Sequence, residues 1–136
     1  PEPRIVLPTN FVILAQNAGG RSKMAFKKFI AIHTYHSEDT KRKFWSGVSN
    51  NLTADVEWVK KWDFDKAKCS ATWVGADDFF FCQWEAENPE DVLSTIAAQG
   101  FDEFIFTAMY RIDMHIDANN LTGKIPYRSV LYLDSD

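Results

Sequence analysis

Two histidines lie three residues apart in the stretch "FIAIHTYHSED", residues 29–39, where their imidazole rings could bind a metal ion or transfer protons. Residues 26–36 are rich in β-branched and aromatic residues, which predicts a β-strand. Side chains of a strand alternate between its two faces, so His33 and His36 should point to opposite sides. The pair therefore cannot chelate one ion within a continuous strand. The simpler interpretation is a strand histidine followed by a histidine at the start of a helix.

His33 has partners of complementary chemistry on later predicted strands. We expect His33 and Tyr35 to share a sheet face with Glu85 and Arg111. In a catalytic site His33 would be the acid or base, and Glu85 would orient it or act as the base. Tyr35 and Arg111 would stabilise negative charge, since the guanidinium binds a carboxylate or phenolate in a bidentate manner. The alternative is a salt bridge across the sheet between Glu85 and Lys68 or Arg111.

Metal binding is a second hypothesis for His33 and for His115. Cys82 with His33 would suit a soft divalent metal, but the predicted alternation places them on opposite faces. His115, in "IDMHID", has two aspartates nearby and could form a surface metal site, although a solvated strand end is the favoured interpretation. Cys82 is expected to be a buried structural cysteine. Cys69 should be its diagonal neighbour, which permits a disulfide but does not require one.

The composition restricts the class of protein. The chain has 136 residues, enough for one domain, and 46% are hydrophobic, enough for a core. A net charge of −4 supplies no basic surface for nucleic acid or an anionic membrane. No apolar run approaches the roughly 18 residues that a transmembrane helix needs. Two cysteines do not make a disulfide framework, which favours a soluble protein of a reducing, intracellular compartment.

The elements that would position these side chains follow the order β-α-α-β-β-α-β. Ser37 is a typical N-cap, and "NPEDVLSTIAAQG" carries a cap, a proline at the first helical position and a terminating glycine. The predicted strands are residues 26–36, 66–74, 79–86 and 104–116, and the predicted helices are 38–49, 52–62 and 89–99. This is the split βαβ, or ferredoxin-like, plan: an α+β domain with a four-stranded antiparallel sheet and helices on one face. Residues 24–116 would form the domain, 1–23 an N-terminal arm or linker, and 117–136 a C-terminal tail.

Alternation along the strands predicts one apolar and one mixed sheet face. If Val74 lies opposite Phe79, an apolar face for the helices contains Cys69, Ala71, Trp73, Phe80, Cys82 and Trp84. The other face would contain His33, Tyr35, Ser70, Thr72, Gln83, Glu85, Thr107, Met109 and Arg111 with Phe29 and Phe81. Such a mixture suits a ligand cavity or a partly polar interface. A hydrated sheet face with no ligand is the alternative.

Three segments, "FIAIHTYH", "FFFCQWEAENPEDVLSTIAAQG" and "FTAMYRID", resemble the small ferredoxin-like domains that pair into dimeric α+β barrels. The resemblance covers about residues 26–116. It implies a homodimer whose sheets pack face to face, with ligand sites inside the barrel or between sheet and helices. Members of this family include monooxygenases, polyketide cyclases, haem-degrading enzymes and metal-binding proteins. The resemblance therefore implies an architecture and a cavity, and it identifies no cofactor.

Two functional hypotheses follow. The first is binding of a small organic ligand or a divalent metal in a sheet-face cavity, with or without cofactor-independent proton-transfer or oxygenation chemistry. The second is a non-catalytic accessory subunit of a larger assembly, imported into an organelle. Its basis is Pro1 in place of an initiator methionine, the proline-rich arm 1–23 and the abundance of aromatic residues. The arm and the tail "PYRSVLYLDSD" would then hold the partner.

Overall fold

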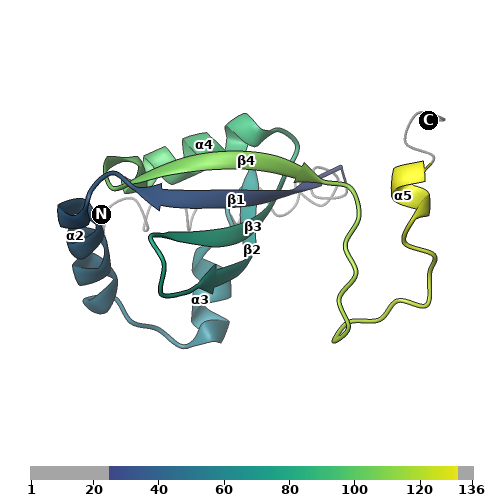
Figure 1. Cartoon of the computed structure of the whole chain (residues 1–136), viewed down its shortest axis with the longest axis horizontal. Helices are drawn as coiled ribbons and strands as arrows, with labels where there is room; N and C mark the ends of the chain where they lie inside the picture. Colours follow the sequence, from purple (N-terminus) through teal and green to yellow (C-terminus); the bar gives the residue numbers. More distant parts are fainter. Residues whose placement is uncertain (1–24, 132–136) are drawn as a thin grey trace.

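A four-stranded antiparallel sheet packs against helices on one side, while a short helix near the C-terminal end stands apart from the sheet (Figure 1). The computed structural model describes residues 25–131, so the predicted arm, residues 1–23, and the last five residues of the tail lie outside the described part. The elements are β1 (Lys27–Tyr35), α2 (Glu38–Ser49), α3 (Asp55–Lys61), β2 (Ala67–Val74), β3 (Phe79–Ala86), α4 (Pro89–Ala98), the 3₁₀ turn η1 (Phe101–Glu103), β4 (Ile105–Ile112) and α5 (Arg128–Leu131). The predicted α+β class with a four-stranded antiparallel sheet is confirmed.

The strand order is β2-β3-β1-β4, and every neighbouring pair is antiparallel.

Helix α2 begins at a capping motif encoded in the local sequence. At α2, the Ser37 side chain accepts a hydrogen bond from the backbone N–H of Thr40 at 3.1 Å, and the Thr40 hydroxyl accepts one from the backbone N–H of Ser37 at 2.9 Å. This reciprocal cap satisfies two N–H groups that a helix start leaves open. No helix of the described residues is long and apolar enough to span a membrane.

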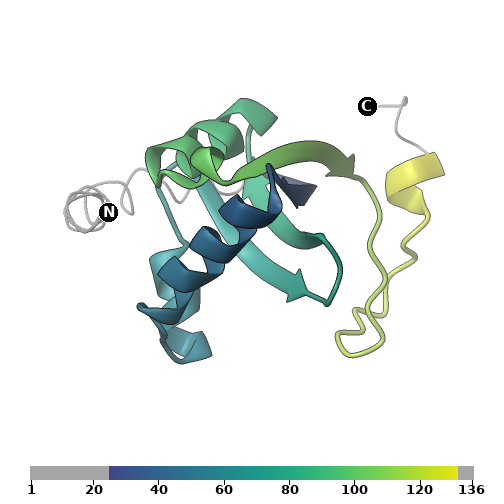
Figure 2. The same ribbon diagram turned by 60° about the vertical axis from the view of Figure 1, so that its left-hand side comes forward.

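The core lies between the sheet and the helices, as Figure 2 shows from the side. From β1, Phe29, Ala31 and His33 are buried there. The helices contribute Phe44 from α2 and, from α4, Val92 and Ile96. We call this side of the sheet the covered face and the other side the open face.

The predicted composition of the two faces was wrong for β1 and β4. The structure pairs Ala31 with Cys82 and Phe29 with Trp84, so these residues share the covered face. On the same face lie His33, Tyr35, Thr107, Met109 and Arg111, which the alternation had assigned to the side away from Cys82 and Trp84. Alternation divides each strand into two sets. The pairing register between strands decides which set of residues on one strand shares a face with which set on the next. The sequence pattern does not contain that register.

The predicted β2–β3 register was right for one half of the hairpin and wrong for the other. Lys68 lies opposite Glu85 and Cys69 opposite Trp84, as expected. A bulge between Cys69 and Ala71 then shifts the pairing by one residue, so Thr72, not Ala71, lies opposite Cys82. The extra residue of a bulge reverses the face of every later side chain in the strand. Trp73 consequently belongs to the open face.

Helix α3 is shorter than predicted, and its expected apolar face is only partly used. Trp58 and Trp62 pack against the core, and the Trp62 ring lies 6.1 Å from that of Trp84 in an edge-on arrangement. Leu52, Val56 and Val59 remain exposed to solvent. The two large indole rings therefore attach α3 to the sheet, while the aliphatic residues of the same segment do not.

Strand β4 ends at Ile112, four residues before the predicted end, and the chain then leaves the sheet. Residues 113–131, which we call the C-terminal segment, run outward and end in α5 (Figures 1 and 2). The predicted tail thus contains a short helix that the sequence did not indicate.

Candidate functional site

His33 lies inside the core and is 2% exposed. Its Nδ1 forms a 2.8 Å hydrogen bond with Oγ1 of Thr107, its neighbour on β4. On the other side, on β3, the Phe80 ring lies 4.6 Å from the imidazole, centroid to centroid. His33 lines neither of the two pockets described below. His36 lies beyond β1, where its Nε2 is 2.9 Å from the backbone oxygen of Asp102.

Tyr35 is held by α2. Its hydroxyl accepts a 2.8 Å hydrogen bond from Trp45 Nε1. The ammonium of Lys41 lies 5.5 Å from the centre of its ring and is also bonded to Asp78 at 2.9 Å. The bond to Asp78 raises the pKa of Lys41. These contacts join the end of β1 to α2 and to the β2–β3 turn, a structural arrangement in which the phenol already has a partner.

Glu85 and Arg111 do not join His33. Glu85 lies on the open face, directly opposite Lys28 and Lys68, so it cannot orient the His33 imidazole. Arg111 is on the covered face but lies opposite Phe29, four residues along β1 from His33, and its Nε donates a 2.8 Å bond to Asp113. The predicted four-residue constellation is therefore not assembled as one site.

No group of three or more His, Cys, Asp or Glu side chains within residues 25–131 is arranged to hold a metal ion. His115 lies beyond the end of β4 and is exposed. The structure thus gives no ligand set for either His33 or His115.

Cys69 and Cys82 form a thiol pair whose burial and diagonal placement were predicted, but whose position on the same face as His33 was not. Cys69 and Cys82 are both buried and free, on neighbouring strands. Cys82 Sγ lies 3.3 Å from Thr72 Oγ1, and the Cys69 thiol donates a 3.5 Å hydrogen bond to the backbone oxygen of Ala71. The expectation that His33 and Cys82 lie on opposite faces was wrong, because it depended on the mistaken face assignment.

The two thiols influence each other. A hydrogen bond with Cys69 lowers the pKa of Cys82, burial raises it, and His33 and Thr72 lower it further. The hydrogen bond with Cys82 and burial both raise the pKa of Cys69. Of the two sulfurs, Cys82 is therefore the one that carries negative charge more readily.

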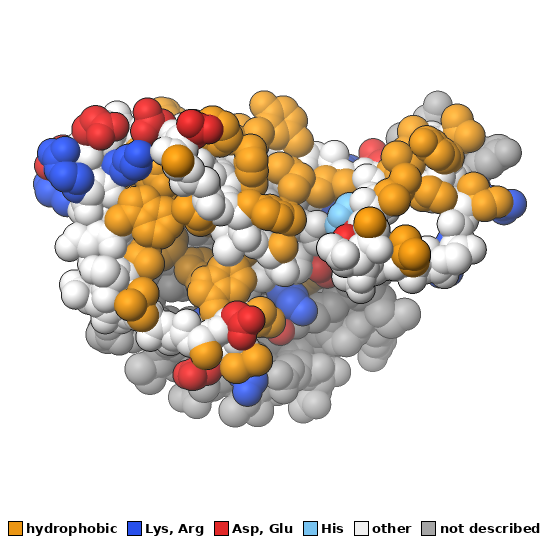
Figure 3. Space-filling model, turned by 60° about the horizontal axis from the view of Figure 1, so that its bottom comes forward, with side chains coloured by type: hydrophobic (Ala, Val, Ile, Leu, Met, Phe, Trp, Pro, Cys, Tyr) orange, Lys and Arg blue, Asp and Glu red, His pale blue; other side chains and the backbone are white. Residues whose placement is uncertain are grey.

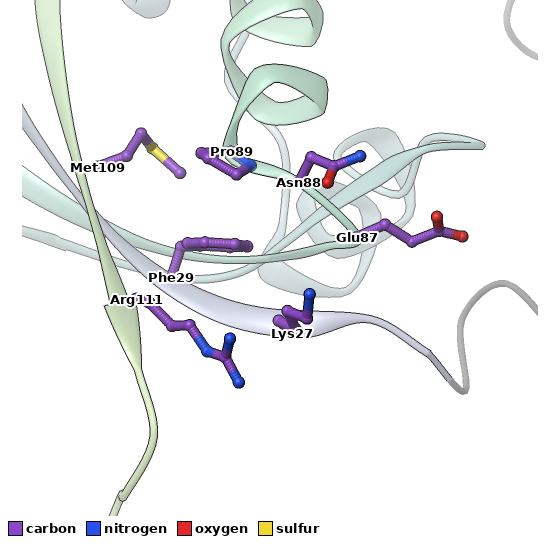
Figure 4. Close-up of a pocket in the computed structure, with 7 residues that line it drawn as sticks. All are labelled: Lys27, Phe29, Glu87, Asn88, Pro89, Met109 and Arg111. Carbon is purple, nitrogen blue, oxygen red and sulfur yellow. The ribbon is translucent and has the colours of Figure 1, made fainter. Parts of the chain in front are cut away.

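A pocket of about 300 Å³ lies at the other end of β1, beside the start of α4 (Figure 4). In this view the Phe29 ring lies between Met109 and Pro89 on one side and Arg111 and Lys27 on the other. Its lining comprises Lys27, Phe29, Glu87, Asn88, Pro89, Met109 and Arg111. The lining brings two cations and the Glu87 carboxylate beside an apolar base, and Asp113, paired with Arg111, lies next to it. We call it the Arg111 pocket. Arg111 and Met109 were predicted to line a cavity, whereas the part played by Lys27 and the α4 start was missed.

A second pocket, of about 460 Å³, lies between α3 and the edge strand β2. It is lined by Thr53, Asp55, Trp58, Val59, Ser70, Ala71, Thr72 and Trp73. We call it the Thr72 pocket. The Thr72 hydroxyl that borders it is the group in contact with Cys82.

Large apolar side chains are exposed on the open face and the C-terminal segment. On the open face, Phe106 is 69% and Tyr110 59% exposed, and Trp73 and Phe79 are also exposed. Hydrophobic side chains also gather over the C-terminal segment at the right of Figure 3, from Ile116, Leu121, Ile125, Tyr127, Val130 and Leu131. Exposed apolar surface of this kind is typical of a protein interface.

Comparison with known proteins does not assign a function. No protein-family model, no curated protein and no solved structure matches this chain.

Proposed function

We propose that this chain binds a small organic anion with an apolar body in the Arg111 pocket. The observation that carries the proposal is the placement of two cations, Lys27 and Arg111, at a pocket whose base is the buried Phe29 ring. Ligand pockets typically combine an apolar lining with a few polar groups that fix orientation. Two cationic groups select a carboxylate or similar anion.

Arg111 is the main anion ligand in this proposal. Its ion pair with Asp113 runs through Nε, so its terminal nitrogens can make further charge-assisted hydrogen bonds. Lys27 adds a second positive charge, and Met109 and Pro89 enclose the apolar part of the ligand. The proposal concerns binding alone, because the buried His33 lines neither described pocket and Glu85 lies on the opposite face.

We further propose a ferredoxin-like topology and pairing of two copies through the open face, with a larger assembly as the competing arrangement. The topology is supported by the β-α-α-β-β-α-β order and by the position of β1 between β3 and β4. The pairing is supported by the exposed aromatic side chains of the open face, among them Phe106 and Tyr110. A second copy would remove these rings from water, which is favourable in proportion to the apolar area buried.

Isothermal titration calorimetry with phenylacetate, an aromatic carboxylate, tests the binding proposal. We expect saturable binding by the wild type and a loss of about tenfold or more in affinity for Arg111→Gln, since a charge-assisted bond contributes about 1.5–3 kcal/mol. Arg128→Gln, at an exposed arginine in α5, is the matched control and should bind as the wild type does. Equal affinities of the wild type and Arg111→Gln, or no heat of binding from the wild type, would contradict the proposal.

A further inference from the structure

A thiol pair lies beneath the helices, separate from the Arg111 pocket. Cys69 and Cys82 come from neighbouring strands and lie diagonally across the β2–β3 pairing, where the bulge after Cys69 shifts the register. They are 1% and 6% exposed. Because Cys69 lies opposite Trp84 and Cys82 lies two residues before Trp84, both thiols are on the covered face as diagonal neighbours. Two free thiols held in this way can form a disulfide if an oxidant reaches one of them.

Polar groups surround Cys82 more closely than Cys69. The Cys82 thiol donates a 3.3 Å hydrogen bond to the Thr72 hydroxyl, and His33 is its diagonal neighbour on β1, two residues beyond Ala31, which lies opposite Cys82. Because His33 Nδ1 is engaged with Thr107 at 2.8 Å, its other ring nitrogen is the one available to Cys82. The neighbouring imidazole favours the thiolate, which is the nucleophilic form of cysteine, by lowering the pKa of Cys82. Cys82 is therefore the attacking thiol, and Cys69 is placed to resolve the product.

The Thr72 pocket supplies a route to Cys82. Thr72 is exposed and lines this pocket, and its hydroxyl oxygen contacts the buried Cys82 sulfur. Thr72 therefore connects the lining of the pocket directly to the Cys82 thiol.

We propose that Cys69 and Cys82 form a peroxide-reactive thiol pair that closes to a reversible disulfide. The Cys82 thiolate attacks one oxygen of hydrogen peroxide, the O–O bond breaks, and hydroxide leaves, which produces a sulfenic acid. The Cys69 sulfur then attacks the Cys82 sulfur, the S–O bond breaks, and water leaves. In total two thiols lose two electrons and two protons, and one peroxide is reduced to two water molecules. A small dithiol reverses the reaction by thiol–disulfide exchange.

Intact-mass spectrometry of the full chain treated with hydrogen peroxide tests the proposal. We expect a product lighter by two hydrogen atoms, a peptide pair linked through residues 69 and 82, and recovery of both thiols with dithiothreitol. Cys69→Ser should instead accumulate a sulfenic acid at Cys82, which a cyclic 1,3-dione traps. The reciprocal Cys82→Ser should trap little or none at Cys69.

A rate comparison keeps the test independent of folding defects in the cysteine variants. In wild type, disulfide formation should be faster in buffer than in urea, because the native contacts activate Cys82. Thr72→Val changes an exposed residue and removes the hydroxyl beside Cys82, so it should slow the native reaction. Thr53→Val, at another threonine of the same pocket, should leave the rate unchanged. A native reaction slower than that in urea, or oxidation that stops at separate cysteines, would overturn the proposal.

Discussion

His33 Nδ1 and Thr107 Oγ1 form a 2.8 Å hydrogen bond between β1 and β4 on the covered face of the sheet. This bond gives the buried imidazole one polar partner and fixes the orientation of the ring. On the neighbouring strand β3, Cys82 lies diagonally opposite His33 on the same face. A residue whose sequence context suggested an open catalytic histidine is thus part of a polar cluster inside the core.

The first prediction concerns this bond. Thr107→Val keeps the shape of the side chain but leaves His33 without its partner on β4. We expect the free energy of unfolding to fall by about 1–3 kcal/mol, the usual cost of a buried polar group that loses its hydrogen bond. Urea denaturation at neutral pH measures it. Thr34→Val, on the open face of β1, is the control and should change stability little. Equal effects of the two substitutions would show that the bond is unimportant.

The second prediction concerns the bond between Trp45 and Tyr35, which joins α2 to β1. Tyr35→Phe removes the hydroxyl that accepts the Trp45 Nε1–H at 2.8 Å. The expected loss of stability is about 0.5–1.5 kcal/mol. Tyr110→Phe removes a hydroxyl from the exposed open face and should have no measurable effect on monomer stability. If Tyr35→Phe does not lower the free energy of unfolding, the apolar contacts of α2 alone determine its position.

The third prediction is a pH dependence that arises from Cys82. Its pKa is lower in the folded chain than in the unfolded chain, so the unfolded state binds more protons between the two values. Stability should therefore rise with pH up to the ordinary thiol value of about 8.5 and be lost as pH falls through the lowered pKa. Above the ordinary value the raised pKa of Cys69 has the opposite effect.

The measurement is the difference in unfolding free energy between wild type and Cys82→Ser across this pH range, in which contributions from other groups cancel. The difference should grow as pH increases below about 8.5. A difference independent of pH would mean that the thiol remains protonated in both states.

The fourth prediction concerns the open face. Phe106→Lys places a charge at the most exposed aromatic residue of the sheet, so it should convert a dimer into a monomer in sedimentation equilibrium experiments. Leu121→Lys, at an exposed residue of the C-terminal segment, is the control and should leave a sheet-to-sheet dimer intact. If the wild type is already monomeric, the dimer proposal is contradicted. The accessory-subunit hypothesis, in which the exposed rings bind a different protein, is then favoured.

Local signals predicted the elements, and long-range pairing decided which residues meet. The cap at Ser37 and the strand at residues 79–86 were predictable because the signals lie within a few residues of each other. The bulge after Cys69 has no such signal, and it changed the neighbour of Cys82.

The residues of the Arg111 pocket were also only partly predictable, because they come from segments far apart in the sequence. Arg111 and Met109 were recognised as cavity residues, but the partners assigned to Arg111 were wrong in part, because Glu85 points to the open face. Lys27 reaches the pocket from the first position of β1, and Pro89 from the start of α4. Their proximity results from the β1–β3 and β1–β4 registers, which no local pattern encodes.

An NMR titration of the isotope-labelled chain with phenylacetate tests anion binding in the Arg111 pocket residue by residue. We expect saturable chemical-shift changes concentrated at Lys27, Phe29, Met109 and Arg111 and at the start of α4, and we expect them to disappear in Arg111→Gln. Shifts concentrated elsewhere in residues 25–131, or none at saturating ligand, would contradict anion binding in the Arg111 pocket.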